Sequence, residues 1–339
     1  MVMTLPSARG ALTTFLLDEL ATPPHALVPP AVDAPADGLA DDDLHLALYL
    51  CYELHYRGLP GVHDGWEWEP TLLAFRRTLE DRFLAALDEA LAGWQPPAAT
   101  PETMDLALRA IAEADDAPSI SRHLETKGTH DQLLEFLVQR SAYQLKEADP
   151  HTFAMPRLHG PPKSAFVEIQ ADEYGGGRPG RLHAELFAKT MDAVGLDDAY
   201  GAYLDILPGD ILATVNLISL FGLHRSRRGA AVGHLAMVEM TSSVPSRRYA
   251  NALRRLGHED DAAVDFFVEH VEADAVHEAV ASVDMAGGLA RLEPELTADI
   301  LFGARALVEV EARWATRVMD AWAQGSSSLR APLPQPAGV

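Results

Sequence analysis

This chain has 339 residues, of which 27 are Lys or Arg and 50 are Asp or Glu, so its formal net charge is −23. Such a charge repels phosphate, which argues against nucleic-acid partners and against binding to anionic membrane surfaces. A single cysteine, Cys51, excludes an internal disulfide and any metal site built from several thiolates. No apolar run reaches the ~18 residues of a membrane span and no secretory signal is visible, so we expect a cytoplasmic protein.

The first 118 residues are expected to form an N-terminal helical extension. Stretches rich in Pro and Gly separate apolar segments that have helical spacing. Asp41–Asp43 offer N-caps for the second segment, and Thr100 with Pro101 opens the fourth. Our hypothesis is that this region packs its helices against the rest of the chain and provides a homodimer surface. The expected helices cover residues 9–20, 44–56, 71–94 and 101–114.

Residues 119–324 are expected to form one helical domain, and residues 325–339, rich in Ser and Pro, a flexible tail. Glycines and prolines break this domain into helix-length segments, and Pro245 is expected to end one of them. Since no segment alternates strictly between apolar and polar residues, the sequence predicts an all-α fold. The expected helices cover residues 132–147, 163–174, 181–194, 210–221, 224–240, 249–257, 262–283 and 296–322.

The segment Phe266–Val280 carries three metal-ligand side chains in the pattern H-x3-D-x2-H. On an α-helix, Asp274 lies about 40° from His270 and His277 lies about 20° on the other side, so the three share one face. Two imidazoles and a carboxylate on one face suit iron or manganese. The alternative is a solvated face of an acidic helix.

A second pair of ligand residues brackets three glycines. Glu173 ends one expected helix, Gly175–Gly177 follow, and His183 begins the next helix. Because three consecutive glycines destabilise a helix, they favour a turn in which Glu173 and His183 can face one centre. Glu168 should face elsewhere, since it lies about 140° from Glu173 on a helix. The alternative is an ordinary loop beside a core histidine.

Further acids lie within apolar helices. Glu239 is expensive to bury unless it is paired or bound to a cation, and its alternative is a carboxylate at a helix end. Glu147 and Glu135 compete for one more ligand position. Glu147 follows Lys146, so a surface ion pair is its alternative, whereas Glu135 has apolar neighbours. We prefer Glu147 and keep Glu135 as the second choice.

Taken in this order, the motifs resemble those of the haem-oxygenase-like diiron oxidases and oxygenases, often described as iron-containing redox enzymes. The resemblance rests on an acid, then D-E-Y-G-G-G with a downstream His, then E-M-T-S-S-V-P, then H-x3-D-x2-H, and covers about residues 119–324. It implies a haem-oxygenase-like helical bundle that holds two Fe(II) ions and takes O2 as cosubstrate. The implied metal ligands, which are also the implied catalytic residues, are Glu147, Glu173, His183, Glu239, His270, Asp274 and His277.

The resemblance also implies an oxidoreductase of natural-product biosynthesis. We expect a small-molecule substrate that is amino-acid-like or a carboxylate, oxidised by C–H desaturation or cyclisation or by N-oxygenation, with an external electron donor as a partner. Two other hypotheses are a non-catalytic acidic helical protein that binds a small molecule or a partner, and a fatty-acid-type oxidative decarboxylase on the same scaffold. Basic side chains near the motifs offer clamps for a substrate carboxylate, with pairing to surface acids as the alternative. They are Arg157, Lys163, Arg178, Arg181, Arg225, Arg227, Arg228, Arg247 and Arg248.

Overall fold

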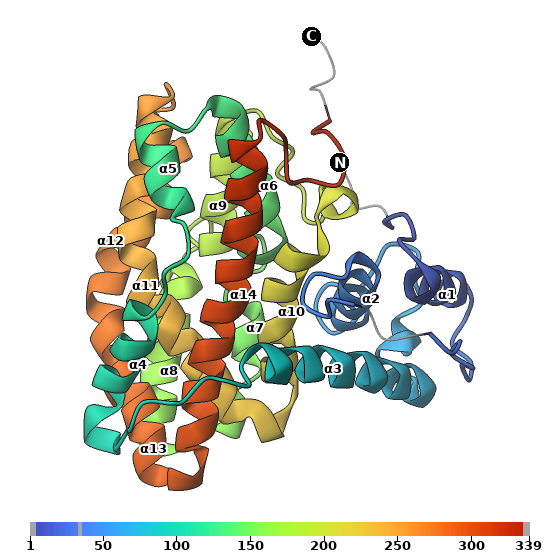
Figure 1. Ribbon diagram of the computed structural model, residues 1–339, viewed down its shortest axis with the longest axis horizontal. Coiled ribbons are helices and arrows are strands. Elements are labelled where there is room, and N and C mark those ends of the chain that lie inside the picture. Colours follow the sequence, from blue (N-terminus) through green and yellow to red (C-terminus); the bar gives the residue numbers. More distant parts are fainter. Residues whose placement is uncertain (1–4, 33–35, 335–339) are drawn as a thin grey trace.

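The computed structural model describes residues 5–32 and 36–334, and within residues 272–276 it describes the backbone only. In these ranges the regular elements are all helices, and no β-strand occurs. The predicted all-α, haem-oxygenase-like architecture is confirmed. Figure 1 shows a bundle of long helices with a smaller group of N-terminal helices beside it.

The N-terminal group contains α1 (Ala11–Leu20), α2 (Asp42–Glu53) and α3 (Pro70–Ala90). Asp41 caps α2 by accepting a hydrogen bond from the Leu44 amide, and Pro70 starts α3 where its missing N–H costs nothing. Helix α2 is buried on nearly every side because α1, α3 and α10 (Gly209–Leu223) all pack against it. Through α2, the N-terminal helices are therefore joined to the bundle.

Three long helices form the centre of the bundle: α11 (Arg228–Arg255), α12 (Asp261–Ala279) and α14 (Thr297–Ala323). Helix α11 packs against both others, and α9 (His183–Ala193) packs against α12 (Figure 1). The remaining α-helices are α4 (Met104–Glu113), α5 (Ile120–Thr126), α6 (His130–Gln144), α7 (Asp149–Thr152), α8 (Gly160–Glu173) and α13 (Gly288–Leu292). A π-helix, η7 (Val280–Gly287), follows α12, and short 3-10 turns, η1–η6 and η8, occupy residues 64–68, 101–103, 155–157, 175–177, 204–206, 225–227 and 294–296.

Two glycines allow α11 and α14 to touch backbone to backbone. A Cβ atom on Gly233 would lie 1.8 Å from the Ile300 carbonyl oxygen, and one on Gly303 would lie 2.0 Å from the Ala230 carbonyl oxygen. Both distances are far below van der Waals contact, so only glycine fits. This close approach holds together the two helices that carry Glu239 and, further along α14, Glu311.

Several expected boundaries differ from the structure. Helix α11 runs through Pro245, where a break was predicted, because contacts with α5, α12 and α14 hold the helix on both sides of the proline. The helix expected to continue to residue 283 changes to π geometry at Val280. Helix α5 was not predicted, since seven residues give too short a pattern.

The C-terminal segment was expected to be flexible, but residues 325–334 make specific contacts. Ser328 is buried and donates two hydrogen bonds to Glu135, and Arg330 pairs with Asp42 at 2.7 Å. These contacts anchor the described part of the segment to α6 and to the start of α2. Residues 335–339 lie outside the described ranges.

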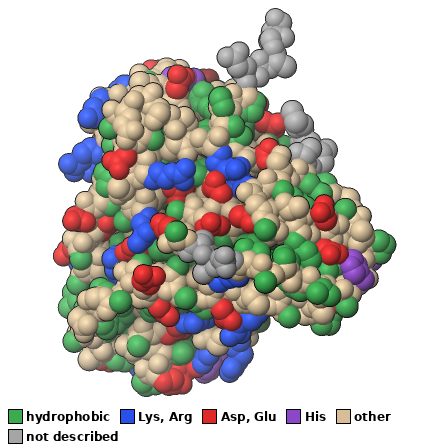
Figure 2. Space-filling view, turned by 45° about the vertical axis from the view of Figure 1, so that its right-hand side comes forward, with side chains coloured by type: hydrophobic (Ala, Val, Ile, Leu, Met, Phe, Trp, Pro, Cys, Tyr) green, Lys and Arg blue, Asp and Glu red, His purple; other side chains and the backbone are tan. Residues whose placement is uncertain are grey.

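The surface in Figure 2 carries Lys and Arg side chains interspersed among Asp and Glu, even though the net charge is strongly negative. None of the described helices combines the length and the apolar character needed to cross a membrane.

Candidate metal centre

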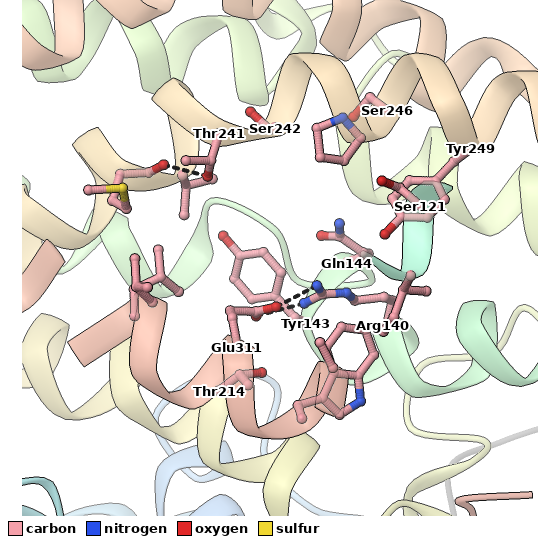
Figure 3. A pocket seen from close by; sticks show the side chains of 18 of the residues that line it. Ser121, Arg140, Tyr143, Gln144, Thr214, Thr241, Ser242, Ser246, Tyr249 and Glu311 are labelled. Atoms are coloured by element: carbon pink, nitrogen blue, oxygen red, sulfur yellow. Dashed lines mark hydrogen bonds and ion pairs between the residues drawn. The ribbon is translucent and has the colours of Figure 1, made fainter. Parts of the chain in front are cut away.

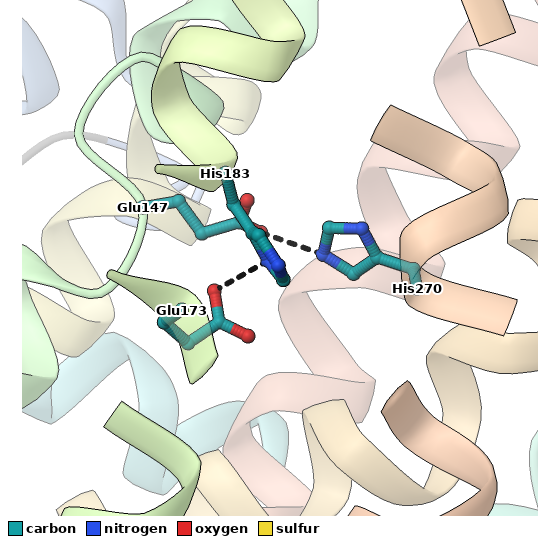
Figure 4. A group of neighbouring side chains, drawn as sticks. All are labelled: Glu147, Glu173, His183 and His270. Atoms are coloured by element: carbon teal, nitrogen blue, oxygen red, sulfur yellow. Dashed lines mark ion pairs between the residues drawn. The ribbon is translucent and has the colours of Figure 1, made fainter. Parts of the chain in front are cut away.

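Four of the seven predicted ligand residues meet at one point inside the bundle. Glu147, Glu173, His183 and His270 each offer a ligand atom, and these atoms all lie within 4.8 Å of one another (Figure 4). They come from the turn after α6, the end of α8, the start of α9 and the middle of α12. Each residue is less than a tenth exposed. We call these four residues the ligand cluster.

A tight turn, residues 145–148, presents Glu147 to the ligand cluster. Helix α6 ends at Gln144, and Ala148 adopts φ 73°, a conformation that non-glycine residues rarely take. Such strain persists only where surrounding contacts hold it, and it is often found at functional sites. Contrary to the surface alternative, Glu147 is buried, and Lys146 points away from it to pair with Glu53.

The three glycines bring Glu173 and His183 together as the sequence predicted. Gly175, Gly176 and Gly177 all have φ between 62° and 73°, and a Cβ on Gly175 would lie 2.5 Å from the Arg181 backbone. The chain therefore reverses tightly between α8 and α9. As a result, Glu173 Oε2 lies 3.0 Å from His183 Nδ1. Glu168 is exposed on another face of α8, as expected.

The orientation of His270 is set within its own helix. Its Nδ1 lies 2.7 Å from the Phe266 carbonyl oxygen one turn earlier, a contact that requires the proton on Nδ1. The lone pair is then on Nε2, which lies 3.6 Å from Glu147 Oε1. A hydrogen bond of this kind on the far nitrogen is how proteins orient histidine ligands of metals.

The acids and imidazoles of the ligand cluster shift one another's pKa. Burial alone would raise the pKa of Glu173, but the neighbouring His183 outweighs it and holds that pKa well below the ordinary value. The same contact raises the pKa of His183 against the effect of its burial. For Glu147, burial dominates and raises the pKa. These directions show that Glu173 and His183 interact strongly, and that burial makes an ionised Glu147 costly unless a cation lies beside it.

The ligand cluster fits a transition-metal ion. Glu147 Oε2, Glu173 Oε2 and His183 Nδ1 are buried and find no hydrogen bond among the described residues, although Glu173 and His183 are close. Leaving such atoms unsatisfied is costly, whereas a cation would satisfy them. Carboxylate oxygens together with imidazole nitrogens are a donor set that suits iron. A small cavity of about 10 Å³ lies among Glu147, Glu173, Glu239 and His270.

Glu239 and His277 form a pair next to the ligand cluster. Both are buried, and His277 Nδ1 lies 3.4 Å from Glu239 Oε2. The other ring nitrogen of His277 lies 2.9 Å from Asp172 Oδ2. Burial lowers the pKa of His277, but the contacts with the two carboxylates outweigh it and raise this pKa to about 9. The side chain of Asp274, the seventh predicted ligand, lies outside the described residues.

Glu135, the second choice for the first acid, lies elsewhere. Its Oε1 accepts hydrogen bonds from the amide and hydroxyl of Ser328 and from Gln139. These contacts tie the C-terminal segment to α6, and Glu135 does not reach the ligand cluster. Of the two candidates, Glu147 is therefore the one placed to bind a metal.

A cavity of about 360 Å³ opens beside the ligand cluster, with Glu147 and His270 in its wall. We call it the large cavity. It lies between α6, α10, α11, α12 and α14, and α5 closes part of it. Its walls are mainly aromatic and apolar, with charged side chains at Asp115, Arg140, Glu147 and Glu311. Figure 3 shows Arg140 and Glu311 among them. Tyr143 lines both cavities.

Sequence reasoning missed several residues around this site. His151 lines the small cavity and lies 3.1 Å, ring nitrogen to ring nitrogen, from His234, which lines the large cavity. Burial lowers the pKa of His151 to about 4, so both rings form a neutral, buried pair. The position of His151, four residues after Glu147, is the one available signal in the sequence. Arg140 and Glu311 have no comparable signal, because their meeting depends on how α6 packs on α14.

The basic side chains expected to clamp a substrate do not line the large cavity. Arg157 donates to the carbonyls of Gly222 and Leu223, and Arg181 and Arg228 pair with Glu269 and Glu293. For Arg181 and Arg228 the alternative of pairing with acids holds, whereas Arg157 contacts backbone carbonyls, which was not expected.

Comparison with known proteins agrees with this geometry. Residues 134–312 match the model of a family described as iron-containing redox enzyme. This segment contains the whole ligand cluster, together with Glu239 and His277. Over 142 residues the chain is 30% identical to the nitrosourea synthase of Streptomyces achromogenes subsp. streptozoticus. That match spans 42% of this chain and 30% of the relative's length.

Proposed function

This chain belongs to the family of iron-containing redox enzymes, and we propose that it is a non-haem diiron oxidase or oxygenase that uses Fe(II) and O2. The observation that carries the proposal is the ligand cluster, whose four buried ligand atoms lie within 4.8 Å of one another and in which Glu147 Oε2 makes no hydrogen bond with the described residues. Glu239, Asp274 and His277 complete the proposed set of four carboxylates and three imidazoles. When bound, iron supplies the activation of dioxygen, which protein side chains cannot provide.

The protein side chains orient the site and exclude water from it. The Phe266 carbonyl holds His270 with Nε2 toward Glu147. The carboxylates of Glu147 and Glu173 offset cationic charge in a place that bulk water does not reach. The burial of all four side chains limits the contact of a reactive centre with solvent.

The large cavity is the proposed substrate site. Its volume is within the range of small-molecule pockets, and it places a ligand directly beside Glu147 and His270. We propose a small amino-acid-like or carboxylate metabolite, with an external donor supplying electrons in the cytoplasm. The relative's name describes synthesis of a nitrosourea, which makes N-oxygenation the first outcome to test, ahead of desaturation or cyclisation.

Anaerobic titration with Fe(II), followed by metal analysis and oxygen-electrode measurements, tests the proposal. We expect about two irons per chain and iron-dependent O2 uptake. His270→Ala should lower iron content and reduce O2 uptake by at least a hundredfold, because it removes a ligand and leaves Glu147 without that neighbour.

His130→Ala is the matched control, since His130 is an exposed histidine at the start of α6 that contacts His258. It should bind iron and consume O2 like the unchanged protein. Full iron content and full O2 uptake in His270→Ala would show that the metal site is not where we place it.

A further inference from the structure

The large cavity contains a bidentate ion pair in a mainly apolar wall, which also includes the acids Asp115 and Glu147. Arg140 on α6 donates two hydrogen bonds to Glu311 on α14, at 2.8 and 2.6 Å. The guanidinium also lies 4.1 Å from the centre of the Trp314 ring, which fixes its plane. Figure 3 shows the pair facing the space between Tyr143, Thr214 and Tyr249.

Arg140 is the sole Lys or Arg among the described residues that line this cavity. Its side chain is 19% exposed and that of Glu311 is 28% exposed, so both lie partly buried in the cavity wall. A guanidinium has five N–H donors, and Glu311 takes two of them in the bidentate contact. Arg140 therefore keeps N–H donors that need acceptors from a ligand in the cavity. A ligand that supplies none leaves these donors without hydrogen bonds.

The charge balance of the pair discriminates between classes of ligand. A ligand with a carboxylate alone, such as a fatty acid, places a second carboxylate beside Glu311 around a single guanidinium in a partly buried wall. A ligand with an amine alone places a second cation beside Arg140 around the single carboxylate of Glu311. A neutral apolar ligand removes water from both charges and returns no hydrogen bonds. Each of these three classes thus incurs an electrostatic cost.

A zwitterion avoids this cost. Its carboxylate can bind Arg140 while its ammonium binds Glu311, so each protein charge keeps an opposite charge beside it. In an α-amino acid the two groups are neighbours, as are the guanidinium and carboxylate of the pair. The side chain of the ligand would then extend along the aromatic wall, where Phe266 leads toward His270.

We propose that Arg140 and Glu311 form the recognition site for the α-amino and α-carboxylate groups of an amino-acid substrate. This inference rests on the proposed function, since it assigns the large cavity as the substrate site. It excludes the fatty-acid class as the preferred ligand. It also moves substrate recognition away from the basic side chains that the sequence suggested to a pair formed only by the packing of α6 on α14.

Anaerobic binding measurements test the inference without turnover. The probes are the proteinogenic L-amino acids, followed by two analogues of the tightest binder, one lacking the amine and one lacking the carboxylate. For L-tryptophan, these analogues are indole-3-propionate and tryptamine. Decanoate represents fatty acids. We expect one amino acid to bind at least tenfold more tightly than both of its analogues and than decanoate.

Two variants should move ligand preference in opposite directions. Glu311→Gln removes the counter-charge of Arg140. The affinity for the analogue without the amine, relative to that for the amino acid, should therefore rise by about tenfold or more. Arg140→Gln releases Glu311, so the decarboxylated analogue should gain instead. A loss of folding would weaken all ligands together and cannot produce opposite shifts. Glu309→Gln, on the same helix but outside the cavity wall, is the control and should leave preference unchanged.

Failure of every amino acid to outbind its single-charge analogues overturns the inference, as does unaltered preference in both variants. The proposed function fails separately, if amino-acid binding follows this pattern but iron and O2 produce no oxidation.

Discussion

The buried histidines differ in what their ring nitrogens contact, and this difference sets their charge. His183 and His277 contact carboxylates, which raise their pKa values against the effect of burial. His45 contacts a carbonyl and an amide instead, and burial lowers its pKa to about 4. At neutral pH, His45 is therefore a neutral structural residue, whereas the carboxylates beside His183 and His277 favour the protonated form of these two rings when no metal is bound.

Because His45 is buried in its neutral form, we predict that the free energy of unfolding decreases as the pH falls. The folded protein keeps this ring neutral down to about pH 4, whereas the unfolded chain takes up a proton below about pH 6.5. The contribution of His45 to the free energy of unfolding therefore falls between pH 6.5 and about 4 and is constant below that. The free energy of unfolding decreases from pH 7 to pH 5.5, and in His45→Gln this decrease should be smaller by about 1 kcal/mol than in the unchanged protein. Urea unfolding at the two pH values measures this. An unchanged pH dependence in the variant would contradict the assignment.

At the scale of elements, helix α2 of the N-terminal group holds the turn that carries Glu147. Lys146 is 1% exposed and donates to Glu53 of α2 at 2.9 Å. Arg57, just beyond α2, donates to the Leu145 carbonyl at 3.0 Å. With Ala148 in a strained conformation, this turn depends on such outside contacts. The N-terminal extension therefore helps to hold the turn that carries Glu147.

Glu53→Gln should lower the affinity for Fe(II) by at least tenfold, because Lys146 loses its buried counter-charge and the turn loosens. The double variant Glu53→Gln with Lys146→Met removes both charges, so folding stability should largely recover while iron affinity stays low. Anaerobic Fe(II) titration and thermal unfolding measure the two effects.

Glu89→Gln, an exposed glutamate on α3, is the control and should bind iron normally. Iron affinity equal to that of the unchanged protein in both the single and the double variant would show that α2 does not position Glu147.

At the scale of the whole molecule, both ends of the described chain close onto the bundle. The N-terminal helices dock through α2 on α10, and Arg330 of the C-terminal segment reaches back to Asp42 at the start of α2. The ligand cluster draws on four separate segments of this single structure. A cation bound there would link α8, α9 and α12 to the turn after α6, so it should stabilise the fold as a unit.

Fe(II) added without oxygen should raise the melting temperature. At a hundredfold excess over the dissociation constant, binding to the folded state adds about 2.7 kcal/mol, roughly a few degrees for a chain of this size. A chelator should reverse the shift, and His270→Ala should abolish it, while His130→Ala should retain it. Scanning calorimetry measures the change; an equal shift in His270→Ala would place the bound iron elsewhere.

Much of the fold and part of the site could be predicted from local patterns. Helix positions follow from apolar spacing and caps, as for α2 with Asp41 and for the Glu173–His183 turn with its three glycines. Pro245 misled the prediction because a local helix breaker was outweighed by packing of α11 against its neighbours. The shared face of His270 and His277 needed only the helical period.

By itself, then, the sequence determined most of the long helices and which acids and imidazoles are candidate metal ligands, because residue chemistry and the helical period act over short stretches of chain. Only the tertiary structure decided that Glu147 rather than Glu135 joins Glu173, His183 and His270, and that Arg140 meets Glu311 in a cavity. These meetings join residues far apart in the chain. They depend on the packing of whole helices, which no local pattern encodes.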